Sequence, residues 1–109
     1  MNTTVVEIVN FKLKPNATKE QLADTHEGIK NFLQKQPGFI YRSLTFSELS
    51  GEWIDLAYWE NMEVAKAASD ALMQDPDGLK MVDLCDMDSV RIQHLSVEAE
   101  AMSASCETA

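Results

Sequence analysis

The sequence has little positive charge and no long apolar run. Of its 109 residues, 9 are Lys or Arg and 18 are Asp or Glu, which gives a formal net charge of −9. The only arginines are Arg42 and Arg91, and no basic run is present. Because recognition of phosphate groups depends on clustered Lys and Arg, this charge excludes a nucleic-acid partner and an anionic membrane surface. The apolar runs are also too short for a transmembrane helix.

Cysteine is scarce, and the familiar catalytic motifs are missing. Cys85 and Cys106 are too few for a disulfide framework, and neither is spaced with a histidine as in a zinc site. No Gly-rich phosphate loop, dinucleotide fingerprint or Ser-His-Asp elbow occurs. The N-terminus lacks the basic and apolar parts of a signal peptide. We therefore expect a reduced, cytoplasmic protein that holds neither a metal nor a cofactor.

The first half of the chain predicts a strand, a helix and a hairpin. Residues 5–11 are rich in Val, Ile and Phe on both parities, which is typical of a strand covered on both faces. Thr18 and Gln21 have the spacing of a capping box, so a helix is expected from there to just before Pro37-Gly38. Residues 39–46 and 53–59 predict two strands joined by a turn at 49–52, where Gly51 can adopt a positive φ.

The second half predicts a helix and a last strand. Asn61 is a candidate N-cap for a helix whose inner face is narrow and rich in Ala. Residues 75–78 are expected to break that helix, residues 79–84 to add one or two turns, and residues 86–88 to form a polar connector. Residues 89–95 alternate as a strand. We expect one domain over residues 1–97 and an acidic, disordered tail over residues 98–109.

The order β-α-β-β-α-β predicts an α+β, ferredoxin-like fold. With right-handed crossovers, both helical segments lie on one face of a four-stranded antiparallel sheet. The opposite face still carries apolar side chains that nothing in this chain covers. An uncovered apolar face in a soluble protein is typical of an oligomer interface, so we expect a homodimer that packs sheet against sheet.

Several segments resemble a known group of proteins. The similarity is to the antibiotic biosynthesis monooxygenase-like members of the dimeric α/β-barrel superfamily. It lies in residues 37–40 (Pro-Gly-Phe-Ile), residues 53–56 (Trp-Ile-Asp-Leu) and Tyr58-Trp59-Glu60. The first strand, residues 6–15, is similar to that of the related stress-responsive barrel proteins. The resemblance covers roughly residues 4–96. It implies a homodimeric α/β barrel with a small hydrophobic pocket between sheet and helices.

The resemblance also implies activities. Some members are cofactor-independent oxygenases of aromatic polyketides, in which the deprotonated substrate itself activates oxygen. Others cleave haem, using an Asn on the first strand, a Trp and a His on a helix. Asn10 and Trp59 match the first two, but no His lies on the second helix, where Ser69 and Asp70 occur. Haem cleavage is therefore disfavoured.

Three residues are candidates for catalysis. His26 lies near the apolar stripe of the first helix, and its ordinary pKa near neutrality suits a general base toward a phenol. A hydrogen-bonded structural histidine is the alternative, and we favour it about two to one. Asn10, polar in an apolar strand, either faces water or orients a substrate oxygen. Tyr58 is the third candidate, as a polar group that orients the substrate.

Four further residues are candidates for substrate binding. Trp59 lies on the opposite face of its strand from Tyr58, so one of the two lines a pocket and the other packs in the core or interface. Tyr41 is a candidate on the second strand. Arg91 and His94 lie on opposite faces of the last strand, with His94 on the side of Val90 and Ile92. Arg91 either pairs with a carboxylate such as Asp55 or binds an anion.

The sequence therefore predicts a small dimer with a hydrophobic pocket. Its first functional reading is a cofactor-independent monooxygenase that acts on an aromatic, polyketide-like substrate. The alternative is a non-catalytic dimer, associated with stress or binding a small hydrophobic or aromatic ligand.

Overall fold

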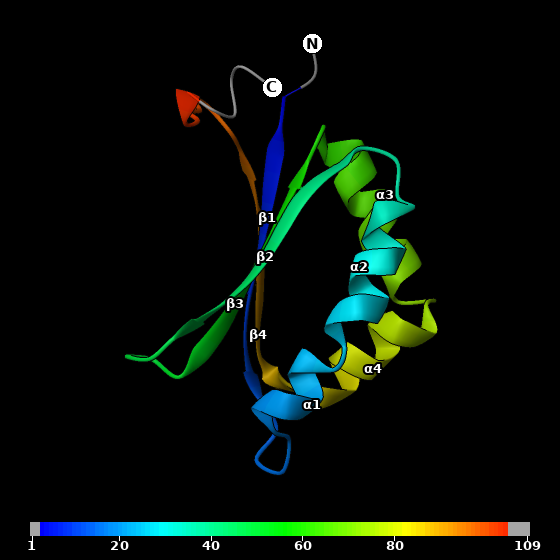
Figure 1. Ribbon diagram of the computed structural model, residues 1–109, viewed down its shortest axis with the longest axis vertical. Coiled ribbons are helices and arrows are strands. Elements are labelled where there is room, and N and C mark those ends of the chain that lie inside the picture. The colour runs from blue at the N-terminus through cyan, green and yellow to red at the C-terminus, as the bar shows by residue number, and fades with distance from the viewer. Residues whose placement is uncertain (1–2, 105–109) are drawn as a thin grey trace.

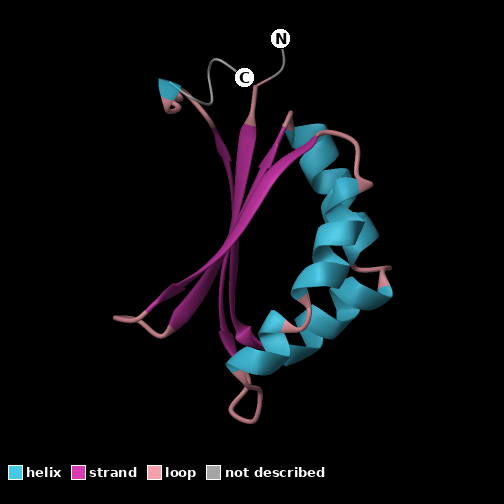
Figure 2. Cartoon of the chain, viewed as in Figure 1, coloured by secondary structure: helices cyan, strands magenta, loops and turns pink. Residues whose placement is uncertain are grey.

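Four strands form one antiparallel sheet in the order β2-β3-β1-β4, and every helix lies on the same face of it (Figures 1 and 2). The computed structural model describes residues 3–104. The strands are β1 (Val5–Leu13), β2 (Phe39–Ser47), β3 (Glu52–Trp59) and β4 (Cys85–Ser96). The helices are α1 (Lys19–Ala23), α2 (His26–Gln34), α3 (Met62–Leu72) and α4 (Pro76–Leu84). This arrangement confirms the predicted α+β, ferredoxin-like fold.

The first crossover begins as predicted but is not one continuous helix. Thr18 Oγ1 accepts from the Gln21 N–H (3.1 Å), and Gln21 Oε1 accepts from the Thr18 N–H (2.8 Å), which completes the capping box. α1 then ends at Ala23, and α2 starts at His26. The Thr25 hydroxyl donates to the Leu22 carbonyl (2.6 Å). Such side-chain bonds to the backbone compete with helical hydrogen bonds, so the expectation of a single helix was wrong.

The second crossover carries two helices around a sharp break. Asn61 Oδ1 accepts from the Val64 N–H (2.9 Å), as expected for the N-cap of α3. Asp75 caps α4 through its contacts to the N–H groups of Asp77 and Gly78 (3.0 and 3.1 Å). Because Pro76 is favoured at the first helical position, α4 already includes residues 76–78. The break is therefore shorter than the sequence indicated.

The last strand is longer than predicted. Residues 86–88, which we expected to form a connector, belong to β4. Asp86 pairs with Lys12 in register, and a bulge follows between Asn10 and Lys12 on the partner strand. The Ser89 hydroxyl accepts the Lys12 N–H (2.7 Å) and donates to the Asp86 carbonyl (2.6 Å). A side-chain hydroxyl thus bridges the irregular part of the ladder and lets polar residues stay in the strand.

The two faces of the sheet differ in what covers them. On the helical side, the buried core includes Val5, Phe11, Ala57 and Trp59 from β1 and β3. β4 contributes Cys85, and the helices contribute the rest of the core, namely Leu22, Ile29, Phe32, Leu33, Ala65, Ala68 and Met81. The other face of the sheet has no described element packed on it (Figure 2). It presents the alternate residues of β1 and β3, namely Val6, Ile8, Asn10, Ile54, Leu56 and Tyr58.

Beyond the sheet, the chain continues as an exposed segment. The Val97 N–H donates to the Thr4 carbonyl (2.8 Å), and residues 98–103 carry no regular secondary structure. The boundary at residue 97 and the disorder of the tail remain predictions, and Cys106 lies outside the described residues. Within residues 3–104, no helix has the length and apolar character needed to cross a membrane.

Candidate functional site

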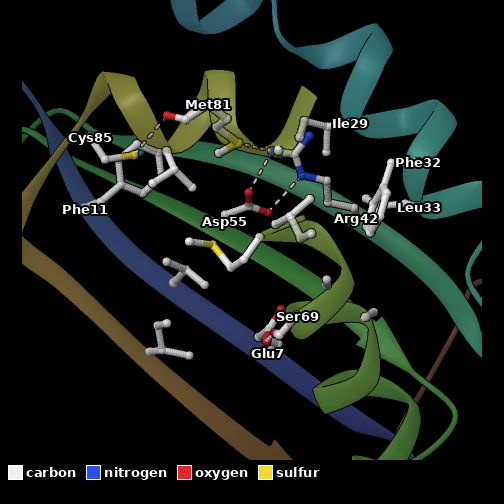
Figure 3. A pocket seen from close by; sticks show the side chains of 18 of the residues that line it. Glu7, Phe11, Ile29, Phe32, Leu33, Arg42, Asp55, Ser69, Met81 and Cys85 are labelled. Atoms are coloured by element: carbon white, nitrogen blue, oxygen red, sulfur yellow. Dashed lines mark hydrogen bonds and ion pairs between the residues drawn. The ribbon is translucent and has the colours of Figure 1, made fainter. Parts of the chain in front are cut away.

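A cavity of about 220 Å³ lies between the helices and the covered face of the sheet (Figure 3). Apolar side chains form most of its wall, among them Phe11, Phe32 and Leu72. The volume lies just below the usual range of small-molecule pockets, so a ligand must be compact. Three exposed apolar residues of the lining, Met73, Met87 and Ile92, mark its mouth.

A buried ion pair stands at the β2 side of the cavity. Arg42 Nε donates to Asp55 Oδ1 (2.9 Å), and Arg42 Nη2 donates to Asp55 Oδ2 (2.7 Å). Their side chains are only 6% and 16% exposed. Arg42 Nη2 also lies 3.7 Å from the Met81 sulfur. Because the two parallel bonds fix the plane of the guanidinium, its third nitrogen has a defined place in the cavity wall.

Two buried donors of this wall have no partner within residues 3–104. They are Arg42 Nη1 and Trp59 Nε1. Ala57, which pairs with Arg42 across the ladder, lies two residues before Trp59 on β3, so the two donors come from neighbouring positions on one face. Nearly all buried polar groups in proteins are hydrogen-bonded, and exceptions need an explanation such as water or a ligand. Arg42 and Trp59 both line the cavity, so these two donors without partners belong to residues of its wall.

A second polar cluster lies on the β1 side of the cavity. Glu7 Oε2 accepts from the Ser69 hydroxyl of α3 (2.8 Å) and lies 2.8 Å from His94 Nε2 of β4. Glu7 and Ser69 both line the cavity. In Figure 3 they lie together, away from Arg42 and Asp55. Charged groups thus occur on both sides of an otherwise apolar cavity.

Cys85 is the third ionisable feature of the lining. It is buried, and its Sγ lies 3.4 Å from the Met81 carbonyl oxygen, to which the thiol donates. Burial, and then the nearby negative charge of Asp55, raise the pKa of this thiol to about 11, while Lys14 acts in the opposite direction. A thiol that stays protonated at neutral pH is a poor nucleophile, so Cys85 serves as an apolar wall.

Several predicted site residues lie away from the cavity. His26 is exposed at the start of α2 and is not among the cavity-lining residues. Asn10 and Tyr58 point to the opposite, uncovered face. Tyr41 is exposed on that face as well, with its ring 6.3 Å from the ring of Tyr58. The structure does not bring His26, Asn10 and Tyr58 together in one pocket, and their catalytic role stays a prediction.

Arg91 also lies outside the cavity and pairs with a carboxylate, as one of its two interpretations predicted, but that carboxylate is Glu52 and not Asp55. Arg91 pairs with Asn10, which pairs with Ile54, so Asp55 points to the other side of the sheet. Arg91 Nη2 instead donates to Glu52 Oε2 (2.9 Å), while Asp55 is held by Arg42. A one-residue offset along β3 separates the two carboxylates and places them on opposite faces.

One of the predicted binding residues, Trp59, lines the cavity, and a second, His94, contacts a residue that lines it. Trp59 is 2% exposed and lines it, with its ring in an edge contact with Phe39 at 5.4 Å. His94 lies on the covered face, as its parity with Val90 and Ile92 predicted, and reaches the cavity through Glu7. Among residues 3–104, no group of three or more His, Cys, Asp or Glu side chains is placed to hold a metal ion.

Glu7 and Arg42 were not predicted to lie at the site, and Asp55 was predicted only as a partner for Arg91. A usable signal existed for the two carboxylates. Glu7 has the same parity as the buried Val5 and Phe11, and Asp55 the same parity as Ala57 and Trp59. A carboxylate at a core-facing position of a strand is costly unless it is paired, so such a residue points to a site.

Solved structures that share this fold include oxygenases. SnoaB from Streptomyces nogalater, a cofactor-independent oxygenase, matches at a TM-score of 0.63 and 14% identity, covering 94% of this chain and 98% of that one. ActVA-Orf6 of Streptomyces coelicolor, a monooxygenase solved in complex with the ligand nanaomycin D, matches at 0.65 and 15%, covering 94% of each chain. This chain has the fold of the antibiotic biosynthesis monooxygenase-like proteins.

The same fold occurs in a dimeric ferredoxin-like protein of unknown function from Jannaschia. That structure matches at a TM-score of 0.65 and 14% identity, covering 86% of this chain and 99% of the other. No protein-family model matches the sequence. No curated protein matches it either. At these identities the likeness establishes the fold, and the function has to be argued from the cavity.

Proposed function

We propose that the protein is a cofactor-independent monooxygenase that oxidises a compact, oxygen-substituted aromatic molecule of polyketide type in this cavity. The observation that carries the proposal is the pair of unpartnered donors, Arg42 Nη1 and Trp59 Nε1, in an otherwise apolar wall. Apolar walls hold the rings, and the donors hold ring oxygens. The oxygenases that share the fold support the same reading.

In the proposed reaction, the substrate itself supplies the electrons that reduce O₂. A ring CH₂ between two aromatic rings, as in an anthrone, reacts with O₂ to give C=O and water, so one oxygen atom enters the product and the other is reduced. The substrate must first lose a proton, because the resulting anion is the electron-rich species that reduces oxygen. The cavity binds the substrate, excludes bulk water and places positive charge near the ring oxygens.

We further propose that two copies pair through the uncovered sheet face, as the dimeric neighbour from Jannaschia suggests. The centre of that face is apolar, with Ile8 opposite Leu56 and Val6 opposite Tyr58. Val6 also pairs with Leu95 on the other side. Burial of such a patch favours association. The cavity lies on the other side of the sheet, so the pairing of copies leaves its lining intact.

The test is oxygen uptake with 1,8-dihydroxyanthrone, read beside the growth of the anthraquinone absorbance. We expect one O₂ consumed for each quinone formed, at a rate well above spontaneous oxidation in buffer. The double variant Arg42→Met with Asp55→Leu should lose this rate, because it removes the charge and the free donor without leaving Asp55 buried and unpaired. Equal rates for wild type, the double variant and buffer would refute the proposal. Binding of the quinone without any oxygen uptake would instead favour the non-catalytic ligand-binding alternative.

A further inference from the structure

The two polar clusters lie on one line across the sheet. His94 of β4 pairs with Glu7 of β1, Glu7 pairs with Ala57 of β3, and Ala57 pairs with Arg42 of β2. All four side chains project to the helical side. Because neighbouring strands are spaced by about 4.8 Å, Glu7 and Arg42 stand about 10 Å apart, with only the methyl group of Ala57 between them. Ala57 lines the cavity between the two charged groups.

The Glu7 carboxylate is held by one oxygen and free at the other. Ser69 and His94 both contact Oε2. No described residue bonds to Oε1, and the Glu7 side chain is 15% exposed while it lines the cavity. From the elements packed around it, β4 presents His94, α3 presents Ser69 and β3 presents the apolar Ala57. A carboxylate positioned in this way has one oxygen available to a ligand.

An isolated carboxylate is a weak base toward a phenol, since its ordinary pKa is about 4 and that of a phenol is close to that of Tyr, about 10. The transfer becomes easier when the product anion is stabilised. In a hydroxylated ring system that also carries a carbonyl, loss of the hydroxyl proton moves negative charge onto the carbonyl oxygen. Arg42, whose Nη1 has no partner among the described residues, lines the cavity away from Glu7 (Figure 3).

We propose that Glu7 is the catalytic base of this cavity, and that the substrate carries an ionisable aromatic hydroxyl on the Glu7 side conjugated with a carbonyl oxygen on the Arg42 side. This inference rests on the proposed oxygenase function and deepens it. In the step, the hydroxyl O–H bond breaks, its proton forms a bond to Glu7 Oε1, and the electron pair stays on the conjugated ring. No electron is transferred until oxygen enters.

His94 is a positioning residue in this scheme. Its ring is 22% exposed and contacts Glu7 Oε2, so it links the carboxylate to the outer edge of β4. Ser69 holds the same oxygen from the helix above. Together the two contacts hold Oε2 and fix the orientation of the carboxylate, which leaves Oε1 without a described partner.

The experiment uses 2-hydroxyanthraquinone, which carries an aromatic hydroxyl conjugated with a carbonyl and does not consume oxygen. This probe reports ionisation directly, because its visible absorbance shifts to the red when the hydroxyl loses its proton. At a pH about one unit below the probe's own pKa, roughly a tenth of the free probe is ionised. We expect most of the probe bound to wild-type protein to be ionised. Glu7→Gln keeps the shape and an acceptor for Ser69, and should return the bound probe to the neutral form. With 3-hydroxyanthrone, whose hydroxyl is conjugated with the carbonyl across the ring, the same variant should lower kcat about 10²-fold with little change in KM.

The controls separate the two proposals. Glu7→Asp keeps a carboxylate and should restore part of the rate, while Glu48→Gln, in the exposed turn between β2 and β3, should behave as wild type. If wild type binds neither compound, the proposed function fails. If wild type oxidises the anthrone but Glu7→Gln does so within threefold, or still ionises the bound probe, Glu7 is not the base. Should Glu7→Gln fail to fold, a neutral probe bound to wild type would overturn the assignment by itself.

Discussion

Removal of Asp55 should destabilise the protein far more than removal of the other paired carboxylate on the same strand. Asp55→Ala leaves the Arg42 guanidinium, 6% exposed, without its two charge-assisted hydrogen bonds of 2.9 and 2.7 Å. Removal of one partner from a buried ion pair costs about 3–5 kcal/mol, a large part of the 5–15 kcal/mol that stabilises a typical domain. We therefore expect the free energy of unfolding to fall by about 3–5 kcal/mol.

The matched control is Glu52→Ala, which breaks the Arg91–Glu52 pair on the opposite face. Its bond has a similar length, 2.9 Å, but the Arg91 side chain is 65% exposed. Exposed pairs contribute about 0.2–1 kcal/mol, so this variant should lose no more than that. Urea unfolding followed by the fluorescence of Trp53 and Trp59, at one protein concentration, measures both. Losses of equal size, or a loss below about 1 kcal/mol for Asp55→Ala, would refute the reasoning.

Three further predictions follow from the cavity, the open face and the buried thiol. Ala57→Leu should weaken binding of 2-hydroxyanthraquinone at least about tenfold, because the larger side chain fills the cavity floor. Its free energy of unfolding should change by less than about 3 kcal/mol. An unchanged Kd would show that the ligand lies elsewhere. Leu56→Glu should give a single-chain mass in light scattering while exposed Lys66→Glu stays dimeric, and a dimeric Leu56→Glu would contradict the proposed interface. Alkylation of Cys85 by iodoacetamide should rise with a midpoint near pH 11, because burial and the charge of Asp55 raise the pKa of its thiol. In the unfolded chain this thiol ionises near its ordinary pKa of 9.0, so its contribution to stability is present below pH 9 and is lost as the pH rises toward 11. An alkylation midpoint near pH 9, followed by mass spectrometry, would contradict the raised pKa.

The fold was predictable because its signals are local. Thr18 and Asn61 cap helices through side-chain bonds that depend on residues three positions away, and Gly51 supplies the positive φ of the hairpin turn. Strand patterns rich in Val, Ile and aromatic residues predicted the four strands and their order along the chain. Each of these features is encoded within a few residues, so tertiary packing had little to override.

The site was not predictable to the same degree because it depends on strand register. Simple alternation from Phe39 would place Tyr41 on the covered face and Arg42 on the open one. A register shift between Phe39 and Tyr41 reverses that order, and Arg42 turns inward to Asp55. A single extra residue in one strand exchanges the faces of everything after it, and no local pattern in this segment marks where the shift occurs.

The charged row across the covered face is best explained by a ligand. Replacement of a buried ion pair by apolar side chains of similar volume is often neutral or stabilising, so Arg42 and Asp55 are not needed for folding. Arg42 Nη1 and Trp59 Nε1 add the cost of donors without partners. An acceptor on the ligand removes that cost, and a ligand at 100 times its Kd adds about 2.7 kcal/mol of stability. The double variant Arg42→Met with Asp55→Leu should therefore have a free energy of unfolding at least as large as that of wild type. 2-Hydroxyanthraquinone, however, should raise the melting temperature of wild type only. A shift of equal size in both proteins would mean that the ion pair serves the fold and not the ligand.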